Sequence, residues 1–356
     1  MRILHVMISP RNEGTTRLVL DWLTVPGHHQ DLLFLDPNGE LRPEFESTGV
    51  WQYYNTEFPL KLTNSLKVIF LLKRICGERH PDIVISWPTG FSQWIHMGAK
   101  LAGVRKLLAH AGNPPSNSFF HRYISSYLSF WTGNILGNQV ITCSDYVRDR
   151  FISIPLISHN QFKRVYNCFR PERFQLSGIP RDKDQAIMVA TLEDHKDHET
   201  LLHAWQILES KGLPYKLLLA GDGSLRPLLT SLIANLKLNN VQLLGSRRDV
   251  PRLLNESAIF IFSTTPKEGF GTVLLEALAA GCIVVASDVP ACREVLKDGE
   301  YGLLVEPANP SMLASKIEQA FSENLSATSL AKHQAYVSGF SPGAMMEQYI
   351  NIAENR

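Results

Sequence analysis

Short apolar runs alternate with segments of helical length along most of the chain. The runs that we expect to form buried strands in the first half are 3–8, 31–35, 83–86, 106–109 and 140–143. Helix-length segments, among them 17–23 and 62–76, lie between these runs. Continuous apolar runs are typical of parallel strands covered on both faces, so the pattern predicts an α/β fold built on a doubly wound sheet.

A second set of strands and helices follows a polar segment. Residues 171–185 contain prolines, a glycine and several charged residues without an apolar period, and we interpret them as an interdomain linker. The later runs expected as strands are 186–190, 216–220, 241–244, 259–263, 283–287 and 302–305. The predicted domains are therefore 1–170 and 186–340, and each is long enough to bury its own core.

The last residues, 341–356, favour a separate helix. Met345, Tyr349 and Ile352 recur at helical spacing after Ser341, so this segment presents one apolar face. We expect that face to pack against another part of the protein.

The composition is that of an ordinary globular protein. The chain has 356 residues, of which 44% are hydrophobic and 19% charged, and its formal net charge is +1. This balance excludes a mainly disordered chain and a protein that neutralises many nucleic-acid phosphates. Residues 1–170 hold 18 Lys and Arg against 12 Asp and Glu, and the rest hold 17 against 22. The basic first half indicates either ordinary surface variation or a preference for an anionic acceptor or membrane surface.

Cysteine usage and the apolar stretches bear on location. The five cysteines show no paired or zinc-ligand spacing, which favours a reducing, cytoplasmic setting. The opening segment 1–9 resembles a buried strand more than a signal peptide. The longest stretch without charge, 123–144, is too polar for a spanning helix, so we expect no transmembrane segment.

Aromatic side chains recur at helical spacing between residues 119 and 131. Phe120, Tyr123, Tyr127 and Phe130 follow one another at intervals of 3, 4 and 3 residues. This stripe is explained either by core packing or by an interfacial helix that holds the basic first domain against lipid.

Residues 263–287 show the most informative pattern, because a strand ends in a glycine-bearing loop that enters a helix. Gly269 and Gly271, on either side of Phe270, leave room for a phosphate to approach the backbone. The helix that begins near Thr272 offers unpaired N–H groups and the positive end of its dipole. The sequence therefore predicts an anion site that binds a pyrophosphate without a metal.

Two carboxylates frame this element. Glu268 lies in the loop, and Glu276 lies eight residues later in the helix. Glu276 can accept hydrogen bonds from the vicinal hydroxyls of a ribose. Glu268 lies on the other side of the phosphate site, where we expect the transferred group to lie. The alternatives are a solvated helix residue for Glu276 and a helix-terminal charge for Glu268.

The stretch from Glu268 to Gly281 resembles the E-x7-E signature of retaining glycosyltransferases of family 4, which have the GT-B fold. The resemblance covers the second half of the chain densely and the first half thinly. It implies two Rossmann-like domains that face each other across a cleft, with acceptor on the first domain and donor on the second. It also implies a last helix that crosses back to the first domain. The implied reaction is retaining transfer of a sugar from a UDP- or GDP-linked donor to an acceptor hydroxyl.

The resemblance assigns further residues to the donor site. Lys196 matches the lysine that grips the donor diphosphate, but Thr191 occupies the position of the usual arginine. Gly221 and Arg247 lie in loops that follow strands, and such loops line the nucleotide in similar enzymes. An ordinary exposed position is the alternative for Lys196 and for Arg247.

Two residues of the first half are placed in the same way. His110 ends a strand, and the resemblance implies that it contacts the donor sugar or the acceptor from the opposite wall. Gly14 follows the first strand and is a candidate on the phosphate side. The alternative for His110 is a purely structural histidine.

No metal site is predicted. The segment Asp182–Asp184 matches a bare D-x-D but precedes a strand in the polar linker, so we interpret it as solvated charge. Asp194, His195 and His198 lie in one polar loop, in which Asp197 is expected to cap the following helix.

The expected enzyme needs no cofactor and has no nucleic-acid partner. Glu268, Lys196 and His110 are its catalytic candidates, and its acceptor is a saccharide, a lipid-linked molecule or a small molecule. We expect it in the cytoplasm, either free or at the inner face of the membrane, in glycan, polysaccharide or glycolipid biosynthesis. Two rival functions would use the same donor site: a nucleotide-sugar epimerase or hydrolase, and a noncatalytic nucleotide-sugar-binding protein.

Overall fold

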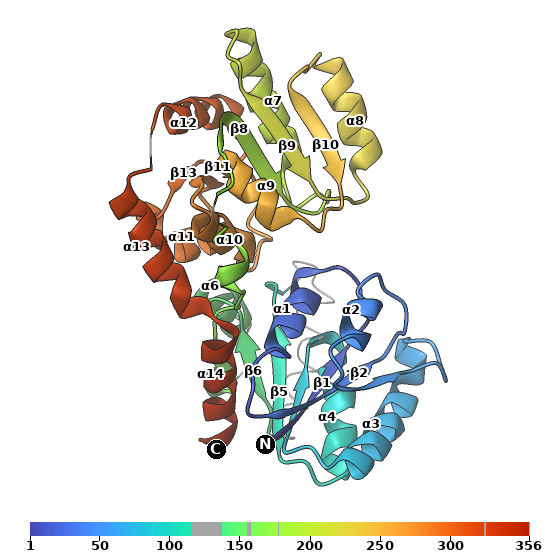
Figure 1. Cartoon of the computed structure of the whole chain (residues 1–356). Coiled ribbons are helices and arrows are strands. Elements are labelled where there is room, and N and C mark those ends of the chain that lie inside the picture. The colour runs from blue at the N-terminus through green and yellow to red at the C-terminus, as the bar shows by residue number, and fades with distance from the viewer. Residues whose placement is uncertain (88, 116–136, 155–157, 177, 324, 356) are drawn as a thin grey trace. The chain divides into compact units, whose positions relative to one another are not determined.

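The described part of the chain forms two compact units (Figure 1). The computed structural model describes residues 1–87, 89–115, 137–154, 158–176, 178–323 and 325–355. Unit 1 consists of 1–168 together with 342–356, and unit 2 consists of 169–341. Each unit contains a parallel sheet with helices packed against it, which confirms the predicted α/β class.

Among the described residues, unit 1 has a seven-stranded parallel sheet in the order β3-β2-β1-β4-β5-β6-β7. Its strands are β1 (Arg2–Met7), β2 (His29–Phe34), β3 (Trp51–Tyr54), β4 (Ile83–Ser86), β5 (Lys106–Ala111), β6 (Gln139–Thr142) and β7 (Phe162–Arg164). Its helices are α1 (Gly14–Trp22), α2 (Arg42–Glu46), η1 (Leu62–Asn64), α3 (Ser65–Arg79), η2 (Thr89–Phe91), α4 (Ser92–Leu101), α6 (Asp145–Ile152), η4 (His159–Gln161) and α14 (Pro342–Glu354).

Unit 2 has a six-stranded parallel sheet among its described residues, in the order β10-β9-β8-β11-β12-β13. Its strands are β8 (Asp182–Val189), β9 (Lys216–Ala220), β10 (Val241–Gly245), β11 (Ser257–Phe262), β12 (Ile283–Ser287) and β13 (Leu303–Val305). Its helices are η5 (Pro171–Arg173), α7 (His198–Ser210), α8 (Arg226–Asn235), α9 (Val250–Glu256), α10 (Thr272–Ala280), α11 (Pro290–Val295), η6 (Lys297–Gly299), α12 (Pro310–Ser322), α13 (Ala327–Val337) and η7 (Ser338–Phe340).

The central strands are buried on both faces, which is why their apolar runs are continuous. In unit 1, Ile3 and Ile83 belong to one buried cluster, while their neighbours Leu4 and Val84 belong to another. Successive residues of a strand point to opposite faces, so each cluster covers one face of the sheet. The doubly wound arrangement predicted from the sequence follows from this burial.

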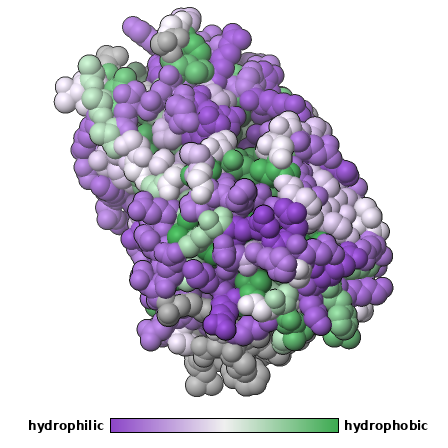
Figure 2. Space-filling view, turned by 60° about the horizontal axis from the view of Figure 1, so that its bottom comes forward, coloured by the Kyte–Doolittle hydropathy of each residue, from purple (hydrophilic) through white to green (hydrophobic). Residues whose placement is uncertain are grey.

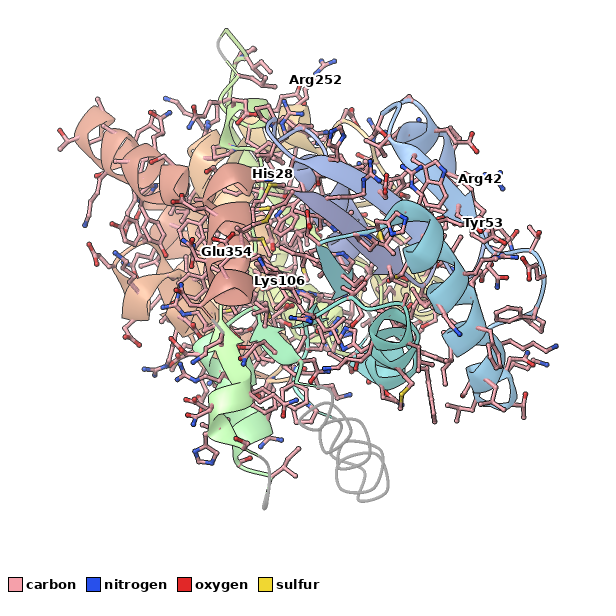
Figure 3. The ribbon with its side chains drawn as sticks, turned by 90° about the horizontal axis from the view of Figure 1, so that it is seen from below. His28, Arg42, Tyr53, Lys106, Arg252 and Glu354 are labelled. Atoms are coloured by element: carbon pink, nitrogen blue, oxygen red, sulfur yellow. The ribbon has the colours of Figure 1, made fainter. Side chains whose placement is uncertain are left out.

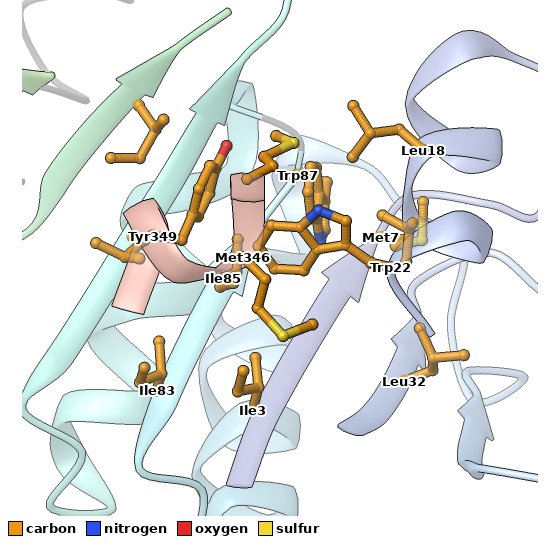
Figure 4. Close-up of a cluster of buried hydrophobic side chains, with 14 of the residues drawn as sticks. Ile3, Met7, Leu18, Trp22, Leu32, Ile83, Ile85, Trp87, Met346 and Tyr349 are labelled. Atoms are coloured by element: carbon orange, nitrogen blue, oxygen red, sulfur yellow. The ribbon is translucent and has the colours of Figure 1, made fainter. Parts of the chain in front are cut away.

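The C-terminal helix α14 belongs to unit 1 and completes its core. It contacts α1 and β5, and its Met346 and Tyr349 lie in the same buried cluster as Trp22 and Trp87 (Figure 4). The apolar face predicted from the helical spacing is the face that packs in this cluster. The chain therefore returns to unit 1 after it has formed unit 2.

The structure differs from the sequence prediction at several boundaries. β8 begins at Asp182, inside the segment expected to be a linker, because Asp182 pairs with Ser257 of β11. The prediction omits two strands at the edges of the first sheet: β3 is only partly buried, and β7 is three residues long. The predicted aromatic stripe at 119–131 lies entirely outside the described residues. None of the helices in the described ranges combines the length and apolar character that a membrane span requires.

Candidate functional site

The loop between β11 and α10 presents the start of a helix that no side chain caps. Gly271 is the N-cap residue, and its φ of 81° is a left-handed conformation that favours glycine. A Cβ atom at this position would lie 3.2 Å from the side chains of both Leu274 and Phe262. The start of α10 therefore offers backbone N–H groups and a positive dipole end to a bound anion.

Lys196 and Glu268 form a buried ion pair beside this loop. The Lys196 ammonium donates to Glu268 Oε2, and the two side chains are 14% and 10% exposed. Glu268 Oε1 accepts from the N–H groups of Gly269 and Phe270 at 3.1 and 3.4 Å. Burial alone would raise the pKa of Glu268. The charge of Lys196 and its hydrogen bond to the carboxylate lower that pKa, and they outweigh burial, so the net shift is downward. Glu268 is therefore ionised at neutral pH.

The loop after β8 is fastened to the loop after β11 through His195. The His195 carbonyl accepts from Thr264 Oγ1 at 2.8 Å and from the Thr265 N–H at 3.1 Å. Asp197 caps α7 by accepting from the Thr200 N–H at 3.3 Å, which confirms the role predicted for it. These hydrogen bonds hold the two loops together, and they therefore fix the backbone on either side of the Lys196–Glu268 ion pair.

Thr191, Gly221 and Arg247 lie at the carboxyl edge of the same sheet. Thr191 follows β8 and is exposed. Gly221 has a φ of 150°, and a Cβ there would lie 1.8 Å from the Ala190 carbonyl oxygen, so only glycine lets these two loops meet. Arg247 donates to the Asp249 carboxylate through two hydrogen bonds of 2.8 and 2.7 Å.

A further cation lies at this edge, Arg226, which the sequence did not lead us to expect. Its Nη1 donates to Asp222 Oδ2 at 3.2 Å, and it lies 3.3 Å from the point where a Cβ of Gly245 would be. Arg226 is the first residue of α8, and its local sequence resembles that of any helix start. Arg226 and Arg247 thus place two guanidinium groups, each paired with an aspartate, at the edge where Thr191 supplies no cation.

The remaining predicted donor residues lie on or beside α10. Thr272 begins the helix and Glu276 lies about one turn later, and both are partly exposed. Phe270 is 2% exposed, and its ring centroid lies 6.3 Å from that of Phe340. These contacts indicate that Phe270 supports the loop by packing beneath it.

In unit 1, His110 lies near the start of α1, where Thr15 follows Gly14, at the carboxyl edge of the sheet. His110 lies on β5, is 1% exposed, and its Nε2 has no hydrogen-bond partner among the described residues. A Cβ at Gly112 would lie 3.3 Å from His110 Nε2 and 3.8 Å from Thr15 Oγ1. Burial lowers the pKa of His110 to about 4, so the ring is neutral near pH 7.

The described residues include no group of three His, Cys, Asp or Glu side chains that could hold a metal ion. Asp182 accepts from Lys216 Nζ at 3.2 Å, and it does so from within β8 instead of from a linker. His198 is 3% exposed, and burial lowers its pKa to about 4. The Asp182 carboxylate of the D-x-D segment is therefore paired with a lysine within the sheet.

Residues 169–336, which cover nearly all of unit 2, match the family described as Glycosyl transferases group 1. An uncharacterized glycosyltransferase of Methanocaldococcus jannaschii is 30% identical over 217 residues, which are 56% of this chain and 53% of that protein. A Campylobacter jejuni enzyme, N-acetylgalactosamine-N,N'-diacetylbacillosaminyl-diphospho-undecaprenol 4-alpha-N-acetylgalactosaminyltransferase, is 36% identical over 202 residues, 55% of this chain and 53% of the enzyme. The chain spans about half the length of these curated relatives.

Solved structures resemble the whole chain. HepE of Anabaena, in complex with UDP and glucose, has a TM-score of 0.84 at 20% identity and covers 100% of this chain and 99% of HepE. WaaG, a glycosyltransferase involved in lipopolysaccharide biosynthesis, has a TM-score of 0.74 at 16% identity and covers 99% of this chain and 100% of WaaG. The two Rossmann-like domains match these structures, which confirms the predicted GT-B fold.

Proposed function

We propose that the protein is a retaining glycosyltransferase of the family 4 type, which moves a sugar from a nucleotide diphosphate sugar to an acceptor hydroxyl. The observation that supports this most is the Lys196–Glu268 ion pair beside the uncapped start of α10. Both features lie in the segment that matches group 1 glycosyl transferases. The HepE structure with the same fold contains UDP, so UDP-linked sugars are the first donors to test and GDP-linked sugars the second.

The donor diphosphate is proposed to bind at the start of α10. Backbone N–H groups at Gly271 and Thr272 would donate to its oxygens, and Lys196 would leave Glu268 to neutralise part of its charge. This arrangement stabilises the leaving group without a metal. Glu276 would accept hydrogen bonds from the ribose hydroxyls, and Arg247 would contact the base or the diphosphate.

The reaction breaks the bond between the anomeric carbon and the diphosphate oxygen, and that oxygen keeps the electron pair. The acceptor oxygen bonds to the same face of the carbon, and its proton passes to the departing phosphate. Glu268 would orient the sugar hydroxyls and stabilise positive charge at the anomeric carbon. We assign no covalent intermediate to Glu268. His110 would position the sugar or the acceptor from the first domain.

Donor screening and product analysis test this function. Thermal shift with UDP- and GDP-linked sugars identifies the donor, and transfer is then assayed with saccharide and lipid-linked acceptors. Glu268→Gln keeps an oxygen that can accept from the Gly269 and Phe270 N–H groups but removes the charge. We expect it to bind donor and to lose roughly 100-fold or more in turnover. The exposed Glu199→Gln on α7 is the control and should turn over normally.

The same assays separate the rival functions. Donor consumption without an acceptor would identify an epimerase or a hydrolase. Donor binding without any turnover, across all acceptors, would identify a noncatalytic binding protein. Normal turnover by Glu268→Gln would remove Glu268 from the reaction.

We further propose that the acceptor is lipid-linked and that the enzyme meets it at the cytoplasmic face of a membrane. The Campylobacter jejuni relative is named for a diphospho-undecaprenol acceptor. The surface of α3 and the preceding turn supports membrane contact in this chain, because Leu62, Leu66 and Phe70 are 72%, 67% and 65% exposed. Leu66 and Phe70, four residues apart, lie on one face of α3, and Leu62 precedes them by the same interval in η1.

Basic side chains border this apolar stripe. Lys67 and Lys73 are exposed on the same outer side of α3, and they form no ion pair with any residue that the structure describes. No acidic residue occurs between Glu57 and Glu78. Apolar side chains flanked by lysines suit a bilayer interface that contains anionic lipid. Figure 2 shows hydrophobic side chains among hydrophilic ones toward its lower right, the side on which α3 lies in Figure 1.

A further inference from the structure

The hydroxyl of Tyr349 contacts His110 across a long separation in sequence. Tyr349 lies on α14 and His110 on β5, 239 residues apart, and their Oη and Nδ1 atoms are 2.8 Å from each other. Both side chains are 1% exposed. The contact therefore links the last helix of the chain to a histidine at the carboxyl edge of the first sheet.

The aromatic surroundings fix the orientation of both rings. The Trp87 ring lies 5.0 Å from His110 and is stacked on Tyr349 at 6.2 Å, and Trp22 packs edge-on against Tyr349 at 5.0 Å (Figure 4). At the end of α14, Glu354 forms an ion pair of 3.9 Å with Lys106, the first residue of β5 (Figure 3). The helix and the strand are thus joined both at the histidine and at the start of the strand.

The hydrogen bond determines which histidine nitrogen carries the proton. Burial raises the pKa of Tyr349 far above its usual value, so the hydroxyl keeps its proton. Among the described residues, His110 Nδ1 is the hydrogen-bond partner of this hydroxyl, and a hydroxyl that accepted there would leave its own buried proton unpaired, so we assign the O–H as the donor to Nδ1. A neutral imidazole that accepts at Nδ1 has its proton on Nε2. Nε2 is the ring nitrogen that has no hydrogen-bond partner among the residues that the structure describes.

We propose that Tyr349 is a positioning residue for the transfer reaction. Its hydroxyl holds His110 in the Nε2–H tautomer and aims that N–H, past Gly112, at an oxygen of the bound substrate. This inference rests on the proposed function, in which His110 contacts the sugar or the acceptor. Gly112 is necessary because a side chain there would occupy the space next to Nε2, where the hypothetical Cβ lies 3.3 Å away.

The variant Tyr349→Phe tests this proposal because it keeps the ring and removes the hydroxyl. We expect kcat to fall by roughly 10- to 100-fold, with the donor KM changed by less than about 3-fold, because the lost interaction orients a group for the reaction. Tyr336→Phe is the matched control, since the Tyr336 hydroxyl donates to the Val295 carbonyl at 2.7 Å in unit 2. It should leave kcat unchanged.

A double-mutant cycle separates positioning from packing. In a His110→Gln background, Tyr349→Phe should reduce kcat no further, because its effect is exerted through the histidine. Equal losses of kcat in both backgrounds, or normal kcat in the single variant, would overturn the proposal.

The tautomer gives a readout that is independent of activity. In ¹⁵N spectra of histidine-labelled protein, the signal missing from His110→Gln identifies His110. We expect an Nε2–H pattern in the wild type and a mixture of tautomers in Tyr349→Phe. An Nδ1–H pattern in the wild type would overturn the inference. Absence of transfer by the wild type with an Nε2–H pattern would instead refute the proposed function.

Discussion

Lys196 and Glu268 neutralise each other, although they come from different loops and are 72 residues apart. Each side chain is largely shielded from water, so neither charge is tolerated without a partner. A donor diphosphate that takes Lys196 from Glu268 would free the carboxylate for the sugar at the same moment. The ion pair of the folded protein and the proposed interactions with the donor therefore use the same two side chains.

Lys196→Met should affect both stability and donor binding. It leaves the Glu268 charge buried without its partner, which should lower the free energy of unfolding by about 3 kcal/mol. Donor affinity should fall by about 10- to 100-fold, the equivalent of one charged hydrogen bond. Denaturant unfolding and calorimetric donor titration measure the two effects.

The double variant Lys196→Met/Glu268→Gln distinguishes them. Removal of both charges should restore most of the stability but none of the donor affinity. Lys267→Met is the control, because Lys267 pairs with exposed Asp194 and such pairs contribute less than about 1 kcal/mol. Unchanged donor affinity in Lys196→Met would remove this lysine from the phosphate site.

Gly221→Ala should be far more damaging than Gly212→Ala. Both glycines have a positive φ, but a Cβ at Gly221 would overlap the Ala190 carbonyl at 1.8 Å, whereas nothing lies within 4 Å of one at Gly212. Gly212→Ala should cost about 1 kcal/mol for its backbone conformation, and Gly221→Ala about 3 kcal/mol or more. Thermal and denaturant unfolding compare the two, and equal costs would contradict the close approach of the loops.

The buried strands and the glycine-bearing loop could be predicted from the sequence because their signals are local. Each central strand is a continuous apolar run, and Gly271 lies directly before an apolar helix. The edge strand β3 gives a weaker signal, since its residues are only partly buried and include a glutamine.

Contacts between distant residues could not be predicted in this way. Nothing near Tyr349 distinguishes it from any core tyrosine of an amphipathic helix, and its bond to His110 exists only because α14 returns to unit 1. Arg226 likewise reaches the Gly245 loop through the fold rather than through any motif. Lys196 and Glu268 were each predictable from the family resemblance, but their direct pairing was not.

Stability should fall as the pH is lowered from about 6.5 to about 4, partly because of His5. This residue is fully buried, accepts from Trp87 Nε1 at 3.2 Å and is bonded to Gln30 Oε1 at 3.1 Å. Burial lowers the pKa of His5 to about 4 from its usual value of 6.5. Between about pH 6.5 and pH 4 the unfolded chain therefore binds a proton at His5 that the folded protein does not bind, so acid favours unfolding.

His5→Gln isolates this contribution. The free energy of unfolding of the wild type should decrease with falling pH more steeply than that of the variant, by about 1.4 kcal/mol per pH unit between roughly pH 6 and pH 4.5. The comparison concerns slopes, so any uniform loss of stability in the variant does not affect it. Parallel curves for the two proteins would contradict the low pKa.

The double variant Leu66→Gln/Phe70→Gln should weaken membrane binding without affecting the fold, because both side chains are exposed on α3. Each buries an apolar group worth about 1.5 to 3 kcal/mol when it enters a bilayer, so binding should fall by more than about 10-fold. Flotation with vesicles that contain about one third anionic lipid measures it. Leu228→Gln/Met312→Gln removes exposed apolar side chains from unit 2 and should bind as the wild type does. Equal binding by both double variants, or no binding by the wild type, would exclude α3 as the docking surface.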